Sequence, residues 1–446
     1  MLIVQKYGGT SVGDCEKIDN VANRVIDALK IPPSQNPKSS KMDFTQNPNE
    51  QNQNEQNLNA KNPKQAQEQN QMQNQLVVVV SAMSGQTDAL INYTKYFSKL
   101  PNEREVDMAL SAGERITAAL LAIALESKGY KAMSLSGEKA GILTDSTHTK
   151  ARIESINTTR IKELLSQGYI VVVAGFQGVS TSGETTTLGR GGSDLSAVAL
   201  AGALKADLCE IYTDVDGVYT TDPRIEKNAR KIDKISYDEM LELASMGAKV
   251  LLNRSVELAK KWGVTLVTRS SFTQKEGTLI TKEENIMEKP IVSGIALDKN
   301  QARVSIADVI DRPGVAAEIF STLANANINV DMIVQTIGRD GKTDIDFTIP
   351  QTDIEQTKLV LESFKKDVES IEYDCDIAKV SIVGVGMKSH SGVASVGFSA
   401  LASENINIMM ISTSEIKVSM VIALRSAESA VRALHSAYKL DSCPVG

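Results

Sequence analysis

Short runs of apolar residues recur along the N-terminal part of the chain, and segments of helical length separate them. The apolar runs predict strands at residues 2–5, 76–80, 132–135, 170–174, 207–212 and 264–268. The segments between them predict helices, among them residues 15–29, 107–125, 161–168, 195–204 and 237–246. Strands that are apolar throughout are typical of a mostly parallel sheet covered by helices on both faces. Residues 1–285 are therefore predicted to form an α/β three-layer sandwich.

One stretch of this N-terminal part does not follow the pattern. Residues 32–75 are dominated by Asn and Gln, with Pro, Lys and Ser, and have almost no apolar side chains. Such a segment cannot bury enough apolar surface to offset the entropy that it would lose on ordering. It is predicted to be a disordered insertion between the first helix and the second strand. The alternative is that it serves as an interaction segment.

The C-terminal part contains an internal repeat. The same spacing separates Gly314 from Gly392 and Asn327 from Asn405. Each copy reads as a βαββαβ unit, residues 298–377 and 378–446, but the second copy ends without its closing strand. An unassigned strand, residues 291–297, precedes the first copy. We predict that this strand completes the second unit, so that the two units are interleaved; the alternative is that it only links the domains.

Composition excludes several classes of protein. A formal net charge of −7 over 446 residues gives no reason to expect a nucleic-acid partner. The four cysteines form no CxxC pair and the three histidines lie far apart, so no zinc signature is present and a reducing, cytoplasmic location is expected. The N-terminus enters a strand without an apolar signal segment, and the longest apolar run, residues 116–125, is too short to span a bilayer. A soluble protein without a membrane partner is expected.

Candidate chemistry gathers just after the predicted strands. Lys6 and two glycines follow the first strand, and the loop 185–197 (TTTLGRGGSDLSA) follows the strand at 170–174. Glycine loops beside a helix start expose main-chain N–H groups to an anion, and Arg190 adds a planar fork for a carboxylate. The alternative is an ordinary turn with Ser193 as the helix N-cap.

Two further sites have open alternatives. Glu114 stands among small residues of an Ala/Leu-rich helix, and its partner is either a substrate ammonium group or a basic side chain, Arg115 or another. The loop 213–224 is rich in Asp and Gly and has two interpretations that can coexist. One is a nucleotide site, with Arg224 on phosphate and a carboxylate near magnesium, and the other is a β-hairpin with an Asp-Gly turn. Ligands of parallel sheets bind outside the carboxyl ends of the strands. We therefore expect the strand-end residues to converge, namely Lys6, Thr87, Arg190, Ser193, Asp194 and Asp214.

Together these motifs resemble the aspartate kinases of the amino-acid kinase superfamily, which carry two C-terminal ACT domains. The resemblance rests on KYGGTSV, VVVVSAMSGQTD, SAGERI, VAGFQGV, TTLGRGGSDLSAVALA, YTDVDGVYTTDPR and GAKVL, and it covers the chain apart from the insertion. It implies the amino-acid kinase fold and phosphorylation of the L-aspartate β-carboxylate by ATP with Mg²⁺. This reaction gives 4-phospho-L-aspartate and begins lysine, threonine, methionine and diaminopimelate biosynthesis.

The resemblance also implies site residues. Those for ATP are Lys6, Tyr7, Gly8, Gly9, Thr213, Asp214, Val218, Tyr219, Thr220, Thr221, Asp222, Pro223, Arg224, Ala248 and Lys249. Those for aspartate are Thr87, Glu114, Arg190, Gly191, Gly192 and Ser193, and the catalytic residues are Lys6, Asp194 and Lys249. In this assignment the two lysines neutralise phosphate charge, Arg190 binds the α-carboxylate, Glu114 binds the α-ammonium and Asp194 holds Lys6. Magnesium is held mainly through ATP.

The loop Asp311-Arg312-Pro313-Gly314 resembles the ligand loop of ACT domains, which implies feedback control by lysine, threonine or both. The implied effector residues are Asp311, Gly314, Val315, Ala316, Asn329, Val330, Asp331, Gln335, Ser412 and Thr413, with residues 389–394 and 411–414 of the second unit facing the first. Pairing of ACT units implies a homodimer or a higher oligomer. A non-catalytic amino-acid sensor on the same scaffold is the alternative function, and the presence of all the charged site residues favours the enzyme.

Overall fold

The computed structural model of the chain describes residues 1–30, 74–245, 251–286, 291–336, 341–365, 368–388 and 390–442. Apart from Asn74 and Gln75, the expected insertion lies outside the described residues. The chain divides into two compact units, Met1–Gly217 with Val250–Lys282, and Val218–Lys249 with Glu283–Gly446. This division differs from the expected domain boundary at residue 285, because residues 218–249 group with the C-terminal part.

The first unit contains the strands that the apolar runs predicted, together with short strands that they did not. Its strands are β1 (Leu2–Tyr7), β2 (Gln75–Val80), β3 (Ala132–Leu135), β4 (Ile142–Thr144), β5 (Ile153–Ile156), β6 (Ile170–Ala174), β7 (Gln177–Ser180), β8 (Thr185–Thr187), β9 (Leu208–Thr213), β11 (Leu266–Ser270) and β12 (Thr278–Thr281). Its helices are α1 (Cys15–Lys30), α3 (Gln86–Phe97), α4 (Glu103–Ser127), α5 (Thr159–Ser166), α6 (Gly192–Leu204) and α8 (Asn253–Trp262).

The main sheet of this unit has the strand order β12–β11–β9–β1–β2–β6–β3. All its neighbouring pairs are parallel except β11 with β12, so the predicted mostly parallel sheet is confirmed. β1 lies centrally, and Lys6 is in register with Val79 of β2 and Ile211 of β9. The carboxyl ends of these parallel strands therefore share one edge.

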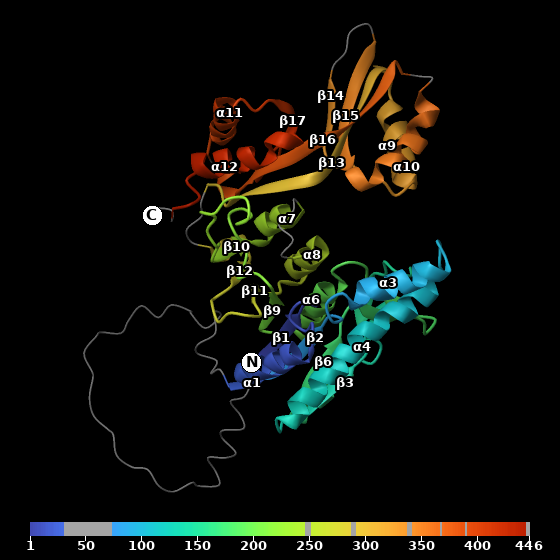
Figure 1. Cartoon of the computed structure of the whole chain (residues 1–446), viewed down its shortest axis with the longest axis vertical. Helices are drawn as coiled ribbons and strands as arrows, with labels where there is room; N and C mark the ends of the chain where they lie inside the picture. Colours follow the sequence, from blue (N-terminus) through green and yellow to red (C-terminus); the bar gives the residue numbers. More distant parts are fainter. Residues whose placement is uncertain are drawn as a thin grey trace, which may run out of the picture. The chain divides into compact units, whose positions relative to one another are not determined.

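Helices cover both faces of the sheet, as the apolar strands predicted. α1 and α4 pack on one face, where Val25 and Leu121 join Val78 and Val172 in one buried cluster, and α6 packs on the other (Figure 1). Fully burying one such side chain stabilises a fold by roughly 1.5–3 kcal/mol. The separate sheet β5–β4–β7–β8 was not predicted, because its short strands carry polar sequences such as TTT and QGVS.

α4 corrects the expectation that no segment could span a bilayer. Among the described residues it is the one helix long and apolar enough to do so by length and composition. Half of its apolar window is buried, however, and Leu121 and Leu125 lie in the core cluster with α1. The core helix of a globular domain meets the same criteria, so the length of α4 is weak evidence for a membrane span.

The second unit contains one sheet shared by both copies of the repeat. The strands of this unit are β10 (Lys234–Ser236), β13 (Gly294–Ile310), β14 (Ile333–Thr336), β15 (Lys342–Pro350), β16 (Ser370–Val383), β17 (Ile408–Thr413) and β18 (Lys417–Ala423). Its α-helices are α7 (Tyr237–Ser245), α9 (Val315–Asn325), α10 (Ile354–Leu361), α11 (Val393–Ser403) and α12 (Ala427–Ala437). Strands β14–β15–β13–β16–β18–β17 form the sheet, and the long strands β13 and β16 run from the α11/α12 half into the α9/α10 half (Figure 1).

The predicted interleaving is confirmed by strand register. Residues 294–298 of β13 pair with residues 379–383 of β16 in the second repeat, while the rest of β13 pairs with β15 in the first. The two copies also match in backbone geometry. Gly314 and Gly392 are the N-caps of α9 and α11, with φ angles of 101° and 89°, a region that favours glycine.

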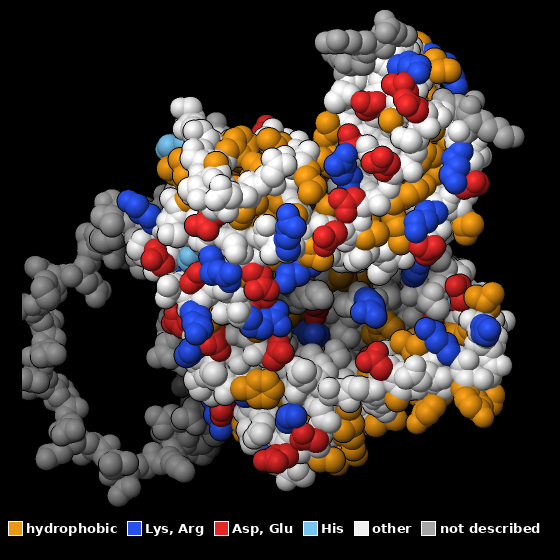
Figure 2. Space-filling view, turned by 45° about the horizontal axis from the view of Figure 1, so that its top comes forward, with side chains coloured by type: hydrophobic (Ala, Val, Ile, Leu, Met, Phe, Trp, Pro, Cys, Tyr) orange, Lys and Arg blue, Asp and Glu red, His pale blue; other side chains and the backbone are white. Residues whose placement is uncertain are grey.

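On the face shown in Figure 2, acidic and basic side chains are interspersed over the described surface.

Candidate active site

The alternation of β1 sends two consecutive candidate residues to opposite faces of the sheet. Tyr7 points into the cluster with α1 and α4, where it is fully buried and stacks on Tyr212 with ring centroids 4.6 Å apart. Its hydroxyl group donates to Gln5 Oε1 at 3.2 Å. The Tyr7 side chain therefore lies in the core, so that only its main chain could contact a nucleotide, and the assignment of Tyr7 to the ATP site stays a prediction.

Lys6 points to the opposite face, toward α6. Its Nζ lies 2.6 Å from Oδ1 of Asp194, which belongs to the first turn of α6, and both side chains are only 12% exposed. An ammonium group has three N–H donors, so this ion pair leaves donors for a further anion at the carboxyl edge of β1. The expected contact between Asp194 and Lys6 is present.

The turn after β1 requires its two glycines. A Cβ atom on Gly8 would lie 3.3 Å from the Lys6 Nζ, and one on Gly9 would lie 3.0 Å from the carbonyl oxygen of Ala82. Side chains at these positions would crowd the ammonium group and push apart the loops that follow β1 and β2. The glycines thus keep space around Lys6.

Glu114 is buried on α4 beside the end of β2, with 3% of its surface exposed. Its Oε1 accepts the N–H of Ala82 at 3.0 Å, whereas its Oε2 is buried without a partner among the described residues. Burial raises the pKa of this carboxyl group to about 7. The alternative of a salt bridge to Arg115 is wrong, because the Arg115 guanidinium donates to Gln177 and Thr185 instead. A buried carboxylate with one free oxygen suits a cationic ligand.

Gln86, in the first turn of α3, was not singled out from the sequence. Its Oε1 is also buried without a partner in the described part of the chain, and it lies 3.6 Å from where a Cβ on Gly113 would be. Its neighbour Thr87 is half-buried. Unsatisfied acceptors on Gln86 and Glu114, which adjoins Gly113, favour a ligand with several N–H donors. The sequence signal that could have identified Gln86 is its position as a polar residue at the start of a helix, directly after a loop of small residues.

The glycine loop places the start of α6. Gly191 is its N-cap, with a φ angle of 69° and no side-chain cap, so the alternative with Ser193 as N-cap is wrong. A Cβ on Gly192 would lie 2.9 Å from Phe176 Cδ2. In this first turn the N–H groups of Gly192 and Asp194 donate to carbonyl oxygens, whereas that of Ser193 makes no hydrogen bond to a described residue. One main-chain donor thus remains at the helix N-terminus.

Asp107, a second residue that the sequence analysis did not single out, anchors the segment before Arg190. It is fully buried on α4, accepts hydrogen bonds from Thr187 Oγ1 at 2.5 Å and the Thr149 N–H at 3.1 Å, and is hydrogen-bonded to His148 Nδ1 at 2.8 Å. Arg190 is exposed and its guanidinium pairs with none of the described residues. The hydrogen bonds of Asp107 thus hold the start of the glycine loop in place, while the Arg190 guanidinium remains available to bind a ligand.

The predicted nucleotide loop begins at the end of β9. Thr213 is the last residue of this strand and its Oγ1 donates to Oδ1 of the exposed Asp214 at 3.0 Å. The alternative β-hairpin is wrong, since β9 pairs in parallel with both its neighbours and the loop makes only one isolated bridge, between Tyr219 and Lys231. Thr213 and Asp214 belong to the first unit with Lys6.

The remaining nucleotide candidates belong to the second unit, and Thr220 has a structural role there. It is 1% exposed; its Oγ1 is hydrogen-bonded to His435 Nε2 at 2.9 Å, its N–H donates to Arg230 O at 2.8 Å and its carbonyl accepts from the Ile295 N–H at 2.7 Å. All its polar groups already have partners within the protein, and its assignment to ATP stays a prediction.

Arg224, the expected phosphate ligand, is 89% exposed and forms a bidentate pair with Asp222, the shortest contact being 2.7 Å. Exposed pairs of this kind contribute only about 0–1 kcal/mol, so the guanidinium can exchange its partner at little cost. Assignment of Val218, Tyr219, Thr221, Asp222, Pro223 and Arg224 to the nucleotide stays a prediction. Ala248 and Lys249 lie outside the described residues.

The expected effector residues lie at the ends of the repeat elements in the second unit. Val315 and Ala316 begin α9, Gln335 belongs to β14, and Ser412 and Thr413 end β17. Asp331 is ion-paired with Lys379, which is 3% exposed on β16. Residues 390–393, Ser395 and Val396 line a cavity with residues of the segment 220–239, and no first-repeat residue is in its described lining.

Comparison with known sequences agrees with this architecture. Residues 56–268 match the amino acid kinase family, and residues 302–369 and 380–438 each match the ACT domain. The aspartokinase of Helicobacter pylori strain J99 is 62% identical over 99% of this chain and 100% of its own length. Aspartokinase 2 of Bacillus subtilis is 47% identical over 99% of each chain.

Comparison with solved structures supports the fold. Escherichia coli aspartokinase III in complex with aspartate and ADP superimposes with a TM-score of 0.76 at 24% identity, covering 98% of this chain and 99% of that chain. The aspartate kinase of Synechocystis is 38% identical with a TM-score of 0.50, covering 100% of this chain and 71% of that chain.

Proposed function

Because this chain belongs to the aspartokinase family, we propose that it transfers the γ-phosphoryl group of ATP to the β-carboxylate of L-aspartate and releases 4-phospho-L-aspartate. One observation carries the proposal: the Lys6–Asp194 pair and the half-satisfied Glu114 carboxylate lie at the carboxyl edge of neighbouring strands. A cation for phosphate and an anion for an ammonium group are thus placed at one edge. The alternative of a non-catalytic sensor is not favoured by relatives named as kinases over the full chain.

The chemistry requires charge neutralisation rather than a general base. The acceptor carboxylate has an ordinary pKa of about 4, so it is already ionised near neutral pH. Transfer then depends on in-line positioning and on donors for the phosphoryl oxygens. Lys6, oriented by Asp194, supplies such donors, and we assign Lys249 the same role. We infer that magnesium arrives with ATP, where it would neutralise the phosphates, and the exposed Asp214 after β9 is the carboxylate best placed to assist it.

Substrate aspartate would be held at both ends of its backbone. Glu114 Oε2 and Gln86 Oε1 receive the α-ammonium group, since these two acceptors lack partners in the described chain, and Thr87 follows Gln86 in the first turn of α3. Arg190 receives the α-carboxylate, because its guanidinium is exposed and unpaired there. The Ser193 N–H adds a main-chain donor at the start of α6. This leaves the β-carboxylate directed toward Lys6.

Regulation would act through the interleaved ACT domains. We propose that lysine, threonine or both bind near Asp311 and Asp331, and that the effector ammonium competes with Lys379 for the Asp331 carboxylate. An effector can inhibit only by favouring a less active arrangement. A cytoplasmic homodimer or higher oligomer, acting at the start of lysine, threonine, methionine and diaminopimelate synthesis, completes the proposal.

The reaction is tested by trapping the acyl phosphate. With L-aspartate, ATP and Mg²⁺ in hydroxylamine, the purified protein should produce aspartate hydroxamate, and lysine or threonine should reduce the rate. Absence of aspartate-dependent hydroxamate with and without each amino acid would leave the sensor as the better account.

The substrate clamp is tested with Arg190→Ala. This variant should raise KM for aspartate by about tenfold or more, because a charge-assisted contact is lost, while KM for ATP changes little. Arg160→Ala is the matched control, since Arg160 is a half-exposed arginine on α5 whose one carboxylate partner among the described residues is Glu163. Equal effects of Arg190→Ala on both substrates would remove the assignment.

A further inference from the structure

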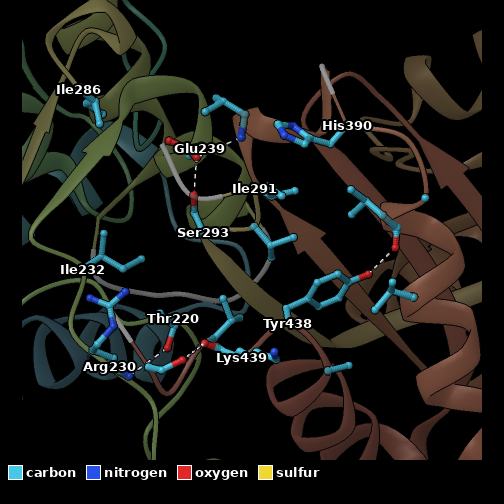
Figure 3. A pocket seen from close by; sticks show the side chains of 18 of the residues that line it. Thr220, Arg230, Ile232, Glu239, Ile286, Ile291, Ser293, His390, Tyr438 and Lys439 are labelled. Carbon is cyan, nitrogen blue, oxygen red and sulfur yellow. Dashed lines mark hydrogen bonds between the residues drawn. The ribbon is translucent and has the colours of Figure 1, made fainter. Parts of the chain in front are cut away.

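A cavity of about 910 Å³ lies within the second unit. Its described lining comes mainly from residues 220–239, from residues 286–293 before β13, from the turn before α11 with the first residues of that helix, and from the end of α12 (Figure 3). Its volume falls in the range of pockets that hold small organic molecules. Of the residues assigned above, only Thr220 and residues 390–393 are in its described lining, so it is distinct from the aspartate site and from the first-repeat effector loop.

Most of the cavity wall is apolar. The apolar side chains come from several separate segments of the chain. They are those of Ile232, Ile286, Ile291, Val292, Val385, Val393, Val396 and Leu440. Val292 and Leu440 are 5% and 6% exposed, so they are held firmly in the wall. An apolar lining of this extent favours a ligand with an apolar body.

The charged side chains of the described wall are mostly cations. Arg230 Nε is buried and has no hydrogen-bond partner among the described residues. The other cations are Lys234 and Lys439, which make no ion pair in that part of the chain. Figure 3 shows Arg230 and Lys439 on one side of the cavity, across from Glu239 and His390. Arg230 as a whole is only partly buried and lines the cavity, so the rest of its guanidinium, with Lys234 and Lys439, offers cationic donors to a bound anion.

The one carboxylate in this wall is already fully engaged. Glu239 is 3% exposed; its Oε2 accepts from the Ser236 N–H and hydroxyl at 3.1 and 2.6 Å. Its Oε1 accepts from Ser293 Oγ at 2.5 Å and the Val385 N–H at 3.1 Å. Tyr438 is also engaged, because its hydroxyl donates to Val393 O at 2.7 Å. No described side-chain carboxylate of the wall is left for a ligand ammonium group.

From this lining we propose that the cavity binds a small organic anion with an apolar body, namely a carboxylic acid that lacks an ammonium group. Its carboxylate pairs with Arg230 and Lys439, and its apolar part packs on Ile232, Val292 and Leu440. Glu239 and its four donors hold the wall in shape without taking part in binding. The site therefore differs in ligand class from an amino-acid effector site.

The proposal is tested by calorimetric titration of the full chain with 3-phenylpropionate, an apolar carboxylate. Binding should be measurable, whereas 3-phenylpropanol, which lacks the charge, and 3-phenylpropylamine, which reverses it, should bind at least about tenfold more weakly. No binding of the carboxylate, or equal binding of all three probes, overturns the proposal.

Variants locate the binding. The double variant Arg230→Gln/Lys439→Gln should weaken 3-phenylpropionate binding by about tenfold or more, and Arg230→Lys should lose less because it keeps the charge. Lys95→Gln, a surface lysine of α3, is the matched control. Undiminished binding to the double variant, or an equal loss in the Lys95 control, contradicts the assigned place.

A second readout rests on the proposed function. Thr220 lines the cavity within the segment 218–224 that is assigned to the nucleotide, so 3-phenylpropionate should shift KM for ATP in the wild type and not in the double variant. Failure of the proposed function would appear as absent hydroxamate formation with calorimetric binding intact. Failure of the cavity proposal would appear as intact turnover with no binding.

Discussion

At the residue scale, the site depends on side chains whose environment changes their ordinary behaviour. Glu114 is the clearest case. Burial raises its pKa to about 7, and the Ala82 N–H, which favours the charged form, compensates only in part. The carboxyl group is thus poised between its neutral and charged forms near neutral pH, and a ligand ammonium group would stabilise the charged form.

This environment predicts a pH dependence of substrate capture. Binding the aspartate ammonium requires the ionised carboxylate, which is lost as pH falls through about 7. At saturating MgATP, kcat/KM for aspartate should therefore be constant above pH 7 and fall by about tenfold per pH unit below it, since this ratio reports the free enzyme. The measurement is a pH profile of hydroxamate formation.

Glu114→Gln is the control for this profile. It should have a lower kcat/KM without the inflection near pH 7, while any titration of ATP affects both proteins equally. The folded wild type binds the Glu114 proton more tightly than the unfolded chain does, so its stability should fall as pH rises from 4.5 to about 7, and the variant should lack that slope. An inflection that persists in Glu114→Gln would assign it to another group.

At the element scale, the long strands β13 and β16 decide how the ACT domains behave. Each strand contributes one end to each repeat, and Met332 of the first repeat packs with Met410 and Val421 of the second. The repeat and the unassigned strand at 291–297 were readable from the sequence. The sequence did not show that the strand predicted at 291–297 continues into the first repeat as one strand, because local sequence patterns do not specify which distant strands pair.

Because the two ACT repeats share these strands, we predict that they lose protection from hydrogen exchange together. Met420→Ala, in the buried core of the second repeat, should destabilise the fold by about 2–5 kcal/mol. Hydrogen exchange should then become faster in β15 of the first repeat as well as in β18 of the second. Mass spectrometry of peptic fragments measures this.

Leu359→Ala is the matched control, because Leu359 is 79% exposed on α10. Exchange in both repeats should be unchanged by this substitution. If Met420→Ala accelerates exchange only around β17, β18 and α12, the repeats are independent in stability, and the shared strands do not couple them.

At the scale of the whole molecule, the residues that flank the Asn/Gln-rich segment are joined within the first unit. The Asn74 N–H donates to Leu29 O at 3.4 Å, its Nδ2 donates to Ala28 O at 2.9 Å, and the Gln75 N–H donates to Met1 O at 2.7 Å. The end of α1 and the start of β2 are therefore neighbours, and the fold does not need a long connection between them.

Replacing residues 34–73 by a short Gly/Ser linker should therefore leave kcat, KM and the thermal unfolding midpoint nearly unchanged. Loop-closure entropy varies only logarithmically with length, and the segment has too few apolar residues to supply core contacts. A variant with the same segment in shuffled order is the control for length. A large loss of folded protein after deletion, but not after shuffling, would mean that the length itself is required.

The sequence by itself determined the parallel sheet, the repeat, the positions of Lys6, Arg190 and Asp194 at or after strand ends and that of Glu114 on an apolar helix, because apolar periodicity and glycine loops are local signals. Only the tertiary structure decided which neighbours those residues meet. It buried Tyr7 on the far face of β1, gave Glu114 a half-satisfied carboxylate, occupied every polar group of Thr220 and placed Arg230 in a cavity wall. Burial and partners arise from segments distant in the chain, and the pKa values and ligand preferences that follow from them cannot be read from one segment alone.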